Sequence, residues 1–215
     1  SLADTPWPLA EFFAPLAGKF SHWNLSTLRS ARRITYDVAA NWKLIFENYS
    51  ECYHCSLVHP ALSRLSPSDS AENDLVEGPF LGGFMTIARG ESLTMSGEAC
   101  AIPVGDIADA DHARVFYYSI FPNLLLSLHP DYVMTHLIWP LAPGRSLIHC
   151  DWFFHPAAAV ANYNPEDAIE FWDLTNRQDW HVCELSQRGI SSRAYEPGPY
   201  SPRESIPAAW DRESL

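Results

Sequence analysis

Residues 41–60, NWKLIFENYSECYHCSLVHP, hold the side chains best suited to chemistry. Apolar residues recur there at helical spacing, and Glu51, His54 and His59 lie close together in the sequence. A buried carboxylate or imidazole is costly unless it is paired or binds a metal. The segment therefore predicts either a metal site or a set of histidines that are satisfied within the core.

The two histidines are five residues apart, which places them about 140° from each other on an ideal helix. They can face one cavity only if the helix tightens, bulges or ends between them. Pro60 disfavours helical geometry at the residue before it, so we expect an ending there. His54 is then predicted in the last helical turns and His59 on the chain that turns away. Two histidines leave a divalent metal under-coordinated, so a third ligand must come from elsewhere.

The surrounding pattern is that of an α+β fold. Residues 1–30 predict a covering arm with a short helix at 10–17, and residues 33–38 predict a strand that leads into the metal-binding helix. Residues 61–82 and 96–112 are expected to be loops. Strand-like runs separated by turn residues predict an antiparallel meander; they are residues 83–89, 114–120, 124–129, 132–141 and 146–155.

A long C-terminal helix follows this sheet. Asn164 occupies the cap position, Pro165 opens the first turn, and the helix is expected to run to about Arg188 and stop at Gly189. The proline-rich tail beyond it is expected to be extended. The predicted architecture is therefore a meander sheet packed against a long C-terminal helix.

Composition limits the classes of partner. The chain has 215 residues, enough for one domain, and a net charge of −12, which argues against nucleic acid or an anionic membrane as partner. No apolar run approaches the ~20 residues of a membrane span. Five cysteines, an odd number without regular spacing, predict reduced thiols in a cytoplasm.

Helical phase identifies the third ligand. One face of the C-terminal helix is largely apolar and comprises Ala168, Ile169, Trp172, Asn176, Asp179, Cys183, Ser186 and Ile190. Asp179 lies in the middle of this face, where an unpaired carboxylate would cost on the order of several kcal/mol. A metal would compensate that charge, and so would a histidine or Lys43. Asp173 belongs to the opposite, solvated face.

Two histidines and one carboxylate leave other metal positions open for a substrate and O2. This donor set is typical of non-haem Fe(II) oxygenases, whereas zinc would accept the same ligands and activate water for hydrolysis. Ligand type alone does not separate the two. Four further histidines could take the place of His59 as a ligand: His129, His136, His149 and His155. His181 is expected to be exposed.

Two motifs carry a resemblance to a known family. The first is Asn41-Trp42-Lys43, Glu47-Asn48, Glu51-Cys52-Tyr53-His54 and His59-Pro60, and the second is Gln178-Asp179-Trp180 with Glu184 and Gln187-Arg188-Gly189. Together they resemble the iron segments of Rieske non-haem iron oxygenase α subunits.

That resemblance implies a helix-grip catalytic domain in which His54, His59 and Asp179 bind mononuclear Fe(II). Asn48 would lie beside the iron. Glu51 would take the place of an acid that bridges the iron site to the Rieske cluster of a neighbouring subunit. The family usually assembles as a homotrimer and receives electrons from a ferredoxin or reductase.

Family members also carry a Rieske domain that holds a [2Fe–2S] cluster through Cys-x-His and Cys-x-x-His motifs. Here residues 52–54 form a Cys-x-His, but no Cys-x-x-His follows. We therefore expect residues 1–215 to be a single catalytic domain without a Rieske domain. The cluster would belong to a missing domain or a partner chain, and the isolated chain should not turn over.

Residues 171–189 and 192–202 look most like the branch that contains choline, carnitine and glycine betaine oxygenases. This branch implies O2-dependent hydroxylation or oxidative demethylation of a quaternary amine by a mono- or dioxygenase. The candidates for an aromatic cage around such a cation are Phe116, Tyr118, Tyr132, Trp139, Trp152 and Phe154. The alternatives are an aromatic-ring-hydroxylating catalytic domain, a non-redox helix-grip domain that binds a small ligand, and a zinc hydrolase.

Overall fold

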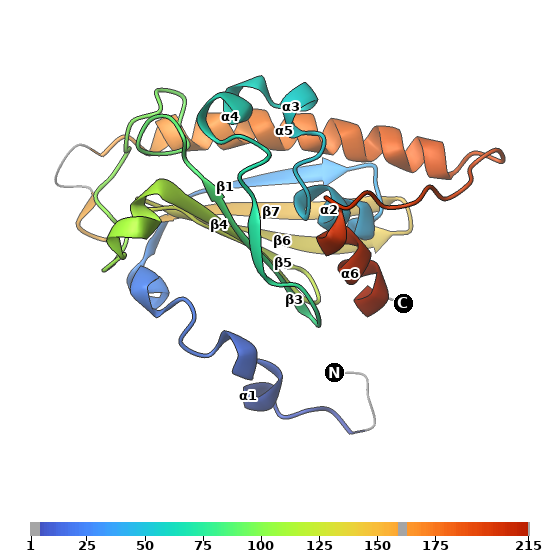
Figure 1. Ribbon diagram of the computed structural model, residues 1–215, viewed down its shortest axis with the longest axis horizontal. Helices are drawn as coiled ribbons and strands as arrows, with labels where there is room; N and C mark the ends of the chain where they lie inside the picture. Colours follow the sequence, from blue (N-terminus) through green and yellow to red (C-terminus); the bar gives the residue numbers. More distant parts are fainter. Residues whose placement is uncertain (1–4, 159–162, 215) are drawn as a thin grey trace.

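A single antiparallel sheet forms the centre of the protein, for which a computed structural model describes residues 5–158 and 163–214 (Figure 1). Its seven strands follow the order β1-β7-β6-β5-β4-β3-β2. The strands are β1 Arg29–Val38, β2 Glu72–Leu75, β3 Phe80–Thr86, β4 Arg114–Ile120, β5 Leu124–Leu128, β6 Val133–Ala142 and β7 Arg145–Phe154. The predicted meander is confirmed in β3 to β7, and β1 extends it by pairing with β7.

Helices cover one face of the sheet, and the N-terminal arm covers the other (Figure 1). The α-helices are α1 Leu9–Phe12, α2 Trp42–Tyr49, α3 Cys55–Val58, α4 Pro60–Leu65, α5 Pro165–Ile190 and α6 Ser205–Ser214. Short 3₁₀ helices occur at η1 Ala14–Leu16, η2 Ser21–Trp23, η3 Leu25–Thr27 and η4 Asp109–Ala113. The long helix α5 lies across the sheet, which confirms the α+β helix-grip architecture.

The helix α5 follows the predicted phase. Asn164 precedes it, Pro165 opens it, and it ends at Ile190, one residue beyond the predicted stop. Its buried residues recur every three or four positions and face the sheet; they include Ala168, Ile169, Trp172, Asn176 and Cys183. The position of Asp179 relative to the sheet is therefore set by the amphipathic helix α5, whose apolar face packs on the sheet.

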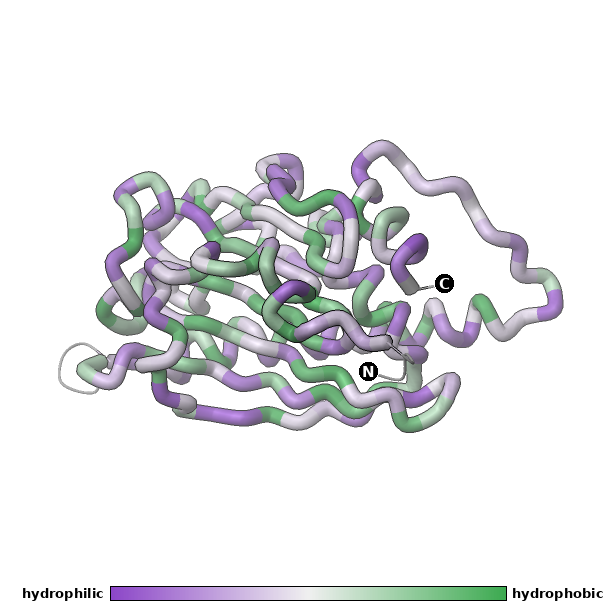
Figure 2. Tube along the Cα trace, turned by 90° about the horizontal axis from the view of Figure 1, so that it is seen from below, coloured by the Kyte–Doolittle hydropathy of each residue, from purple (hydrophilic) through white to green (hydrophobic). Residues whose placement is uncertain are grey.

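Alternation along the strands divides the core into two layers. On β4, Val115 and Tyr117 belong to the layer under the helices, whereas Phe116 and Tyr118 pack against the N-terminal arm. Trp23 of the arm is buried there and donates from its indole nitrogen to the His129 carbonyl at 3.1 Å. In Figure 2 the extended segment between α5 and α6 is largely hydrophilic, in contrast to the greener strands.

The prediction that His54 lies in the last turns of the metal-binding helix is wrong, because that helix, α2, ends before both histidines. Helix α2 stops at Tyr49, where the Ser50 hydroxyl bonds back to the Phe46 carbonyl at 2.5 Å. His54 then precedes the short helix α3, and His59 separates α3 from α4. Pro60 opens α4, and His59 has the non-helical φ of −118° that a following proline favours.

Two further predictions are corrected. Residues 61–82 are not one long loop, because α4 and β2 lie within them, and residues 205–214 form α6 rather than an extended tail. The last helix forms because Ile206, Ala209 and Trp210 make one apolar stripe that docks on α2. Trp210 is fully buried and stacks on Phe46 with a ring separation of 4.2 Å.

The cysteines divide into two groups. Cys52 and Cys55 form a disulfide, so the prediction of reduced thiols is wrong for this pair. Cys100, Cys150 and Cys183 are free and buried, as small apolar side chains would be. Among the described helices, none combines the length and the apolar character that crossing a membrane requires.

Candidate metal centre

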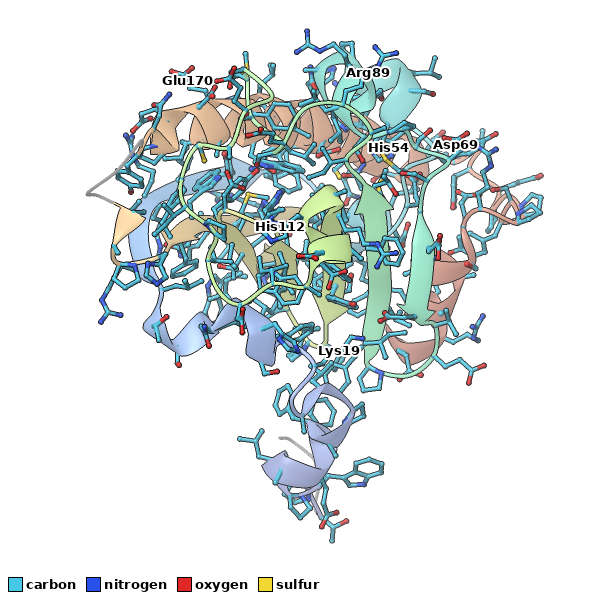
Figure 3. The ribbon with its side chains drawn as sticks, turned by 60° about the vertical axis from the view of Figure 1, so that its left-hand side comes forward. Lys19, His54, Asp69, Arg89, His112 and Glu170 are labelled. Atoms are coloured by element: carbon cyan, nitrogen blue, oxygen red, sulfur yellow. A yellow bond between two sulfur atoms is a disulfide. The ribbon has the colours of Figure 1, made fainter. Side chains whose placement is uncertain are left out.

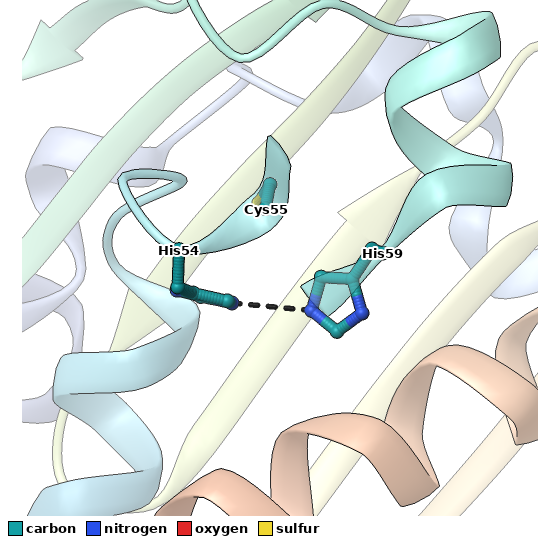
Figure 4. Close-up of side chains that lie close together, drawn as sticks. All are labelled: His54, Cys55 and His59. Carbon is teal, nitrogen blue, oxygen red and sulfur yellow. Dashed lines mark hydrogen bonds between the residues drawn. The ribbon is translucent and has the colours of Figure 1, made fainter. Parts of the chain in front are cut away.

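His54, His59 and Asp179 meet at one point, although they come from three different segments. The Nε2 atoms of His54 and His59 are 3.1 Å apart, and Asp179 Oδ1 lies 3.2 Å from the first and 2.8 Å from the second. Figure 4 shows a nitrogen of each imidazole pointing toward the other ring, and the two ring planes are 77° apart. Figure 3 places His54 beneath the α3–α4 segment, on the opposite side of the sheet from Lys19 of the arm.

The other nitrogen of each imidazole is held by a hydrogen-bond acceptor. His54 Nδ1 donates to Glu51 Oε1, and His59 Nδ1 donates to Gln178 Oε1 at 2.8 Å. These contacts place a ring proton on each Nδ1, because a carboxylate oxygen and an amide oxygen can only accept. In the neutral form of each ring, the Nε2 lone pair then points at Asp179 Oδ1. Three acceptors that converge in this way repel one another unless a cation lies between them.

The spacing of the three donor atoms distinguishes between metal geometries. Donors about 2.1 Å from one ion are about 3.0 Å apart on an octahedral face and about 3.4 Å apart in a tetrahedron. The observed separations of 2.8, 3.1 and 3.2 Å lie nearer the octahedral value. The three residues therefore fit one divalent metal ion bound from one side, and Fe(II) and zinc both accept two imidazoles and a carboxylate as ligands.

Cys55 is the other potential ligand at this point. Ligand atoms of His54, Cys55 and His59 all lie within 4.8 Å of one another. The Cys55 sulfur is bonded to Cys52, however, and a disulfide sulfur offers no thiolate to a metal. Figure 4 also shows that this sulfur does not lie between the two rings. Asp179 is therefore the better third ligand.

Charges in the site shift two pKa values in opposite directions. Burial lowers the pKa of His54, but the Asp179 and Glu51 carboxylates outweigh it and raise this pKa to about 9. Burial raises the pKa of Asp179, but hydrogen bonds from His54 and His59 bring it below its usual value. A proton on His54 thus satisfies the same acceptors that a metal would, as in the alternative histidine–aspartate pairing. Metal and proton compete for one lone pair.

Asn48 and Glu51 both lie next to His54. The Asn48 amide nitrogen is 3.3 Å from His54 Nε2, so this side chain borders the metal position. Glu51 is only 12% exposed, and its second carboxylate oxygen accepts from the backbone nitrogens of Tyr53 and His54. Glu51 therefore fixes the orientation of the His54 ring.

The remaining histidines that were considered do not enter the site. His136 Nε2 donates to the Asn176 amide oxygen at 3.0 Å, and buried His129 stacks on Tyr132. His149 contacts Thr35, and the ring of His155 contacts the backbone nitrogen of Ala157. His181 is exposed, as predicted. Sequence reasoning named Gln178 as part of the second motif but assigned it no role, although its position directly before Asp179 was a usable signal.

A cavity of about 360 Å³ opens onto the three ligands. Its inner wall is aromatic and small-polar, and is formed by Tyr49, Tyr117, Ser119, Trp172 and Thr175. None of the six aromatic residues considered for a cation cage lines this cavity, so that prediction is wrong. Tyr118 and Phe116, for example, lie on the layer under the arm.

A smaller hollow of about 170 Å³ lies on another side of the site. It reaches Glu51 and His54 from α2, α5 and the C-terminal segment, and Glu47 and Tyr200 border it. Burial and the neighbouring Asp211 raise the pKa of Glu47 to about 7. The candidate ligand His54 is thus bordered by two separate spaces, one largely aromatic and one acidic.

Comparison with known proteins agrees with the geometry. Residues 25–209 match the family described as ring hydroxylating alpha subunit (catalytic domain). The oxygenase subunit of glycine betaine monooxygenase from Pseudomonas aeruginosa is 29% identical, over 94% of this chain and 54% of the relative. The chloroplastic choline monooxygenase of Arabidopsis thaliana is 24% identical, over 89% of this chain and 43% of the relative. The chain spans about half the length of the curated relatives it matches.

Solved structures show the same fold. A quaternary ammonium Rieske monooxygenase linked to carnitine oxidation aligns with a TM-score of 0.75 at 17% identity, over all of this chain and 57% of the other. Naphthalene 1,2-dioxygenase from Rhodococcus aligns with a TM-score of 0.64 at 13% identity, over all of this chain and 62% of the other. The fold is therefore shared between relatives that act on very different molecules.

Proposed function

We propose that this chain, which belongs to the family of ring-hydroxylating alpha-subunit catalytic domains, supports O2-dependent oxidation of a small substrate at mononuclear Fe(II). The observation that carries the proposal is the convergence of two imidazole nitrogens and one carboxylate oxygen, each within 3.2 Å of the other two. His54, His59 and Asp179 would hold the iron, which supplies O2 activation when it is bound. Two neutral imidazoles and one carboxylate leave such a site with residual positive charge.

The residues around the ligands orient them. Glu51 and Gln178 hold the Nδ1 protons of His54 and His59, so that both Nε2 lone pairs stay available. Asn48 borders the metal position and orients what binds there. The cavity beside the ligands admits a small molecule and shields it from bulk water with aromatic walls.

We further propose that the substrate is a small quaternary amine, hydroxylated or oxidatively demethylated next to its nitrogen. Relatives are named for glycine betaine and choline, and a solved neighbour for quaternary ammonium substrates. Aromatic faces from Tyr49, Tyr117 and Trp172 in the cavity suit a cation of this kind.

Electrons would come from a [2Fe–2S] cluster outside residues 1–215, which we treat as the catalytic unit. The cluster would belong to a Rieske domain or partner chain served by a ferredoxin or reductase, and the neighbour linked to carnitine oxidation is described with inter-subunit electron transfer. Glu51 supports this route because it contacts His54 and also borders the smaller hollow. A homotrimer is the assembly we propose, and the isolated chain should be inactive.

Metal content is the decisive test. Protein purified without oxygen and reconstituted with Fe(II) should hold about one iron per chain, and Asp179→Ala should lose it. Asp173→Ala is the matched control, because this carboxylate lies on the same helix but bonds to Tyr36 and Arg177. Zinc in place of iron would favour hydrolysis. A folded chain that takes up no metal would contradict the proposal and leave a non-redox binding domain.

A further inference from the structure

One hydroxyl group on the wall of the cavity is uncommitted. Tyr117 lines the cavity from β4, and its hydroxyl has no hydrogen-bond partner among residues 5–158 and 163–214. Burial raises the pKa of this phenol well above its usual value, so the group stays protonated and can donate at neutral pH. Tyr117 is partly buried and lines the cavity, so its hydroxyl is available to a ligand there.

The neighbouring polar groups of the same wall are already occupied. The Tyr49 hydroxyl donates to the Leu126 carbonyl at 2.9 Å, and Thr175 donates to the Phe171 carbonyl at 3.0 Å. The Trp172 indole nitrogen donates away from the cavity, to the Tyr132 hydroxyl at 2.6 Å. Among the polar side chains of this inner wall, Tyr117 therefore carries the donor that is left free within the described residues, beside several aromatic faces.

The sheet keeps Tyr117 uncovered. Its register partners are Gly83 on β3 and Ser127 on β5, so no large side chain flanks the ring on either strand. Gly83 cannot be larger, because an added Cβ would lie 1.9 Å from the Glu72 carbonyl oxygen of β2. The close approach of β2 thus excludes a side chain beside the phenol.

No charged group stands behind the phenol. Buried His129 lies edge-on to Tyr117 with ring centroids 6.4 Å apart, and burial holds its pKa well below the usual value, so this imidazole is neutral. Among the described residues that line the cavity, Arg203 is the one arginine or lysine, and it is exposed on the segment before α6. Recognition on the inner wall therefore depends on a neutral donor rather than on a cation.

We propose that Tyr117 is the specificity-determining residue of the cavity, and that its hydroxyl donates to an oxygen acceptor carried by a small quaternary ammonium substrate. The aromatic faces hold the ammonium group, and the phenol distinguishes ligands that carry an oxygen from those that lack one. This inference rests on the proposed function for the class of substrate, but it concerns binding and not turnover.

The test compares three ligands with one cationic group. Choline carries a hydroxyl, glycine betaine carries a carboxylate, and tetramethylammonium carries no oxygen. Affinities are measured by calorimetry on the full chain reconstituted with Fe(II) without O2, for the wild type, Tyr117→Phe and Tyr118→Phe. Tyr118 is the matched control, because it lies one residue away on the opposite face and its hydroxyl contacts Asp74.

The wild type and Tyr118→Phe should bind choline or glycine betaine more tightly than tetramethylammonium. Tyr117→Phe should weaken the oxygen-carrying ligand about 3- to 10-fold, the range of one hydrogen bond, and change tetramethylammonium less than 2-fold. Which of the two oxygen ligands is affected identifies the acceptor as a hydroxyl or a carboxylate.

Equal weakening of all ligands would show that the ring only packs, and would overturn the inference. An unchanged preference in Tyr117→Phe, or no binding of any of the three by folded wild type, would overturn it as well. The experiment separates this inference from the proposed function. A chain that takes up no iron but shows a preference that depends on Tyr117 would support the inference and contradict the oxygenase site. Thermal unfolding of each variant confirms that the fold is retained.

Discussion

The contact between Gln178 and His59 offers a sharp test of the site, because Gln178 would not itself touch the metal. The Gln178 amide oxygen accepts from His59 Nδ1 at 2.8 Å, and His59 is only 2% exposed. Gln178→Leu removes the acceptor and keeps a side chain of similar length. The His59 ring then loses the group that holds its proton on Nδ1, and the proton can move to Nε2, where it blocks the metal.

Gln178→Leu should change two quantities, the unfolding free energy of the metal-free chain and the affinity for iron. A buried N–H left without an acceptor costs about 1–3 kcal/mol of unfolding free energy in the metal-free chain. Loss of a contact that orients a metal-binding histidine typically lowers metal affinity about 10- to 100-fold, or about 1.4–2.7 kcal/mol. The iron-loaded chain should therefore lose more stability than the metal-free chain, by this second amount.

Urea unfolding with and without Fe(II) measures both quantities, and competition with a chelator gives the affinity directly. Gln187→Leu is the matched control, because Gln187 lies on the same helix and accepts from the Asn41 backbone nitrogen at 2.8 Å. It should lower stability without changing iron affinity. Gln178→Glu restores an acceptor and should recover most of the affinity. If Gln178→Leu and Gln187→Leu bind iron equally well, the proposed role of His59 Nε2 is refuted.

Three further predictions concern the surroundings of the site. Burial and Asp211 raise the pKa of Glu47 from 4.5 to about 7, so the folded chain keeps a proton in this interval that the unfolded chain releases. That contribution to stability is fully present below pH 4.5 and lost as the pH rises to 7. The difference in unfolding free energy between Glu47→Gln and the wild type, measured with urea, should therefore shift by about 1–2 kcal/mol in favour of the variant as the pH rises from 5 to 8. This value is reduced because the side chain is partly exposed. The same difference at both pH values would contradict the prediction. Trp210→Ala should cost about 3–5 kcal/mol in the same assay by emptying the stack on Phe46, whereas a loss below about 1 kcal/mol would mean that α6 is not docked. Alkylation of the unfolded, unreduced chain should label three cysteines in mass spectrometry, and five labels would restore the original prediction of reduced thiols.

Periodicity explains which parts of the fold and site were predictable. The strands β4 to β7 differ from their predicted ranges by at most one residue at each end, because alternation and turn residues are local signals. Asp179 was recognised because a single carboxylate interrupted an apolar stripe on a long helix. That argument needed no knowledge of the sheet, since any sheet would have to cover the stripe.

Features that depend on contacts between distant segments were missed. Helix α6 carries a short apolar stripe, follows a segment with three prolines and contains a fourth, Pro207; it is stabilised by docking on α2 rather than by helix propensity. The cavity wall was also misassigned, because the choice between Tyr117 and Tyr118 depends on which face of β4 lies under α5. The sequence pattern of β4 is aromatic on both faces, since the arm covers the second one.

The error over the histidines is informative about how the site is built. A continuous helix could not bring His54 and His59 together, and the chain resolves this by ending α2 at Tyr49 and placing each histidine at an end of α3. Both ligands therefore stand on a segment of short helices, whereas Asp179 and Gln178 stand on the longest helix of the fold. Asp179 is the third ligand, and the neighbouring Gln178 orients the His59 ring. Glu51 orients the His54 ring from within the segment that carries the two histidines. Metal binding should consequently order the segment around α3 against α5, and not move α5 itself.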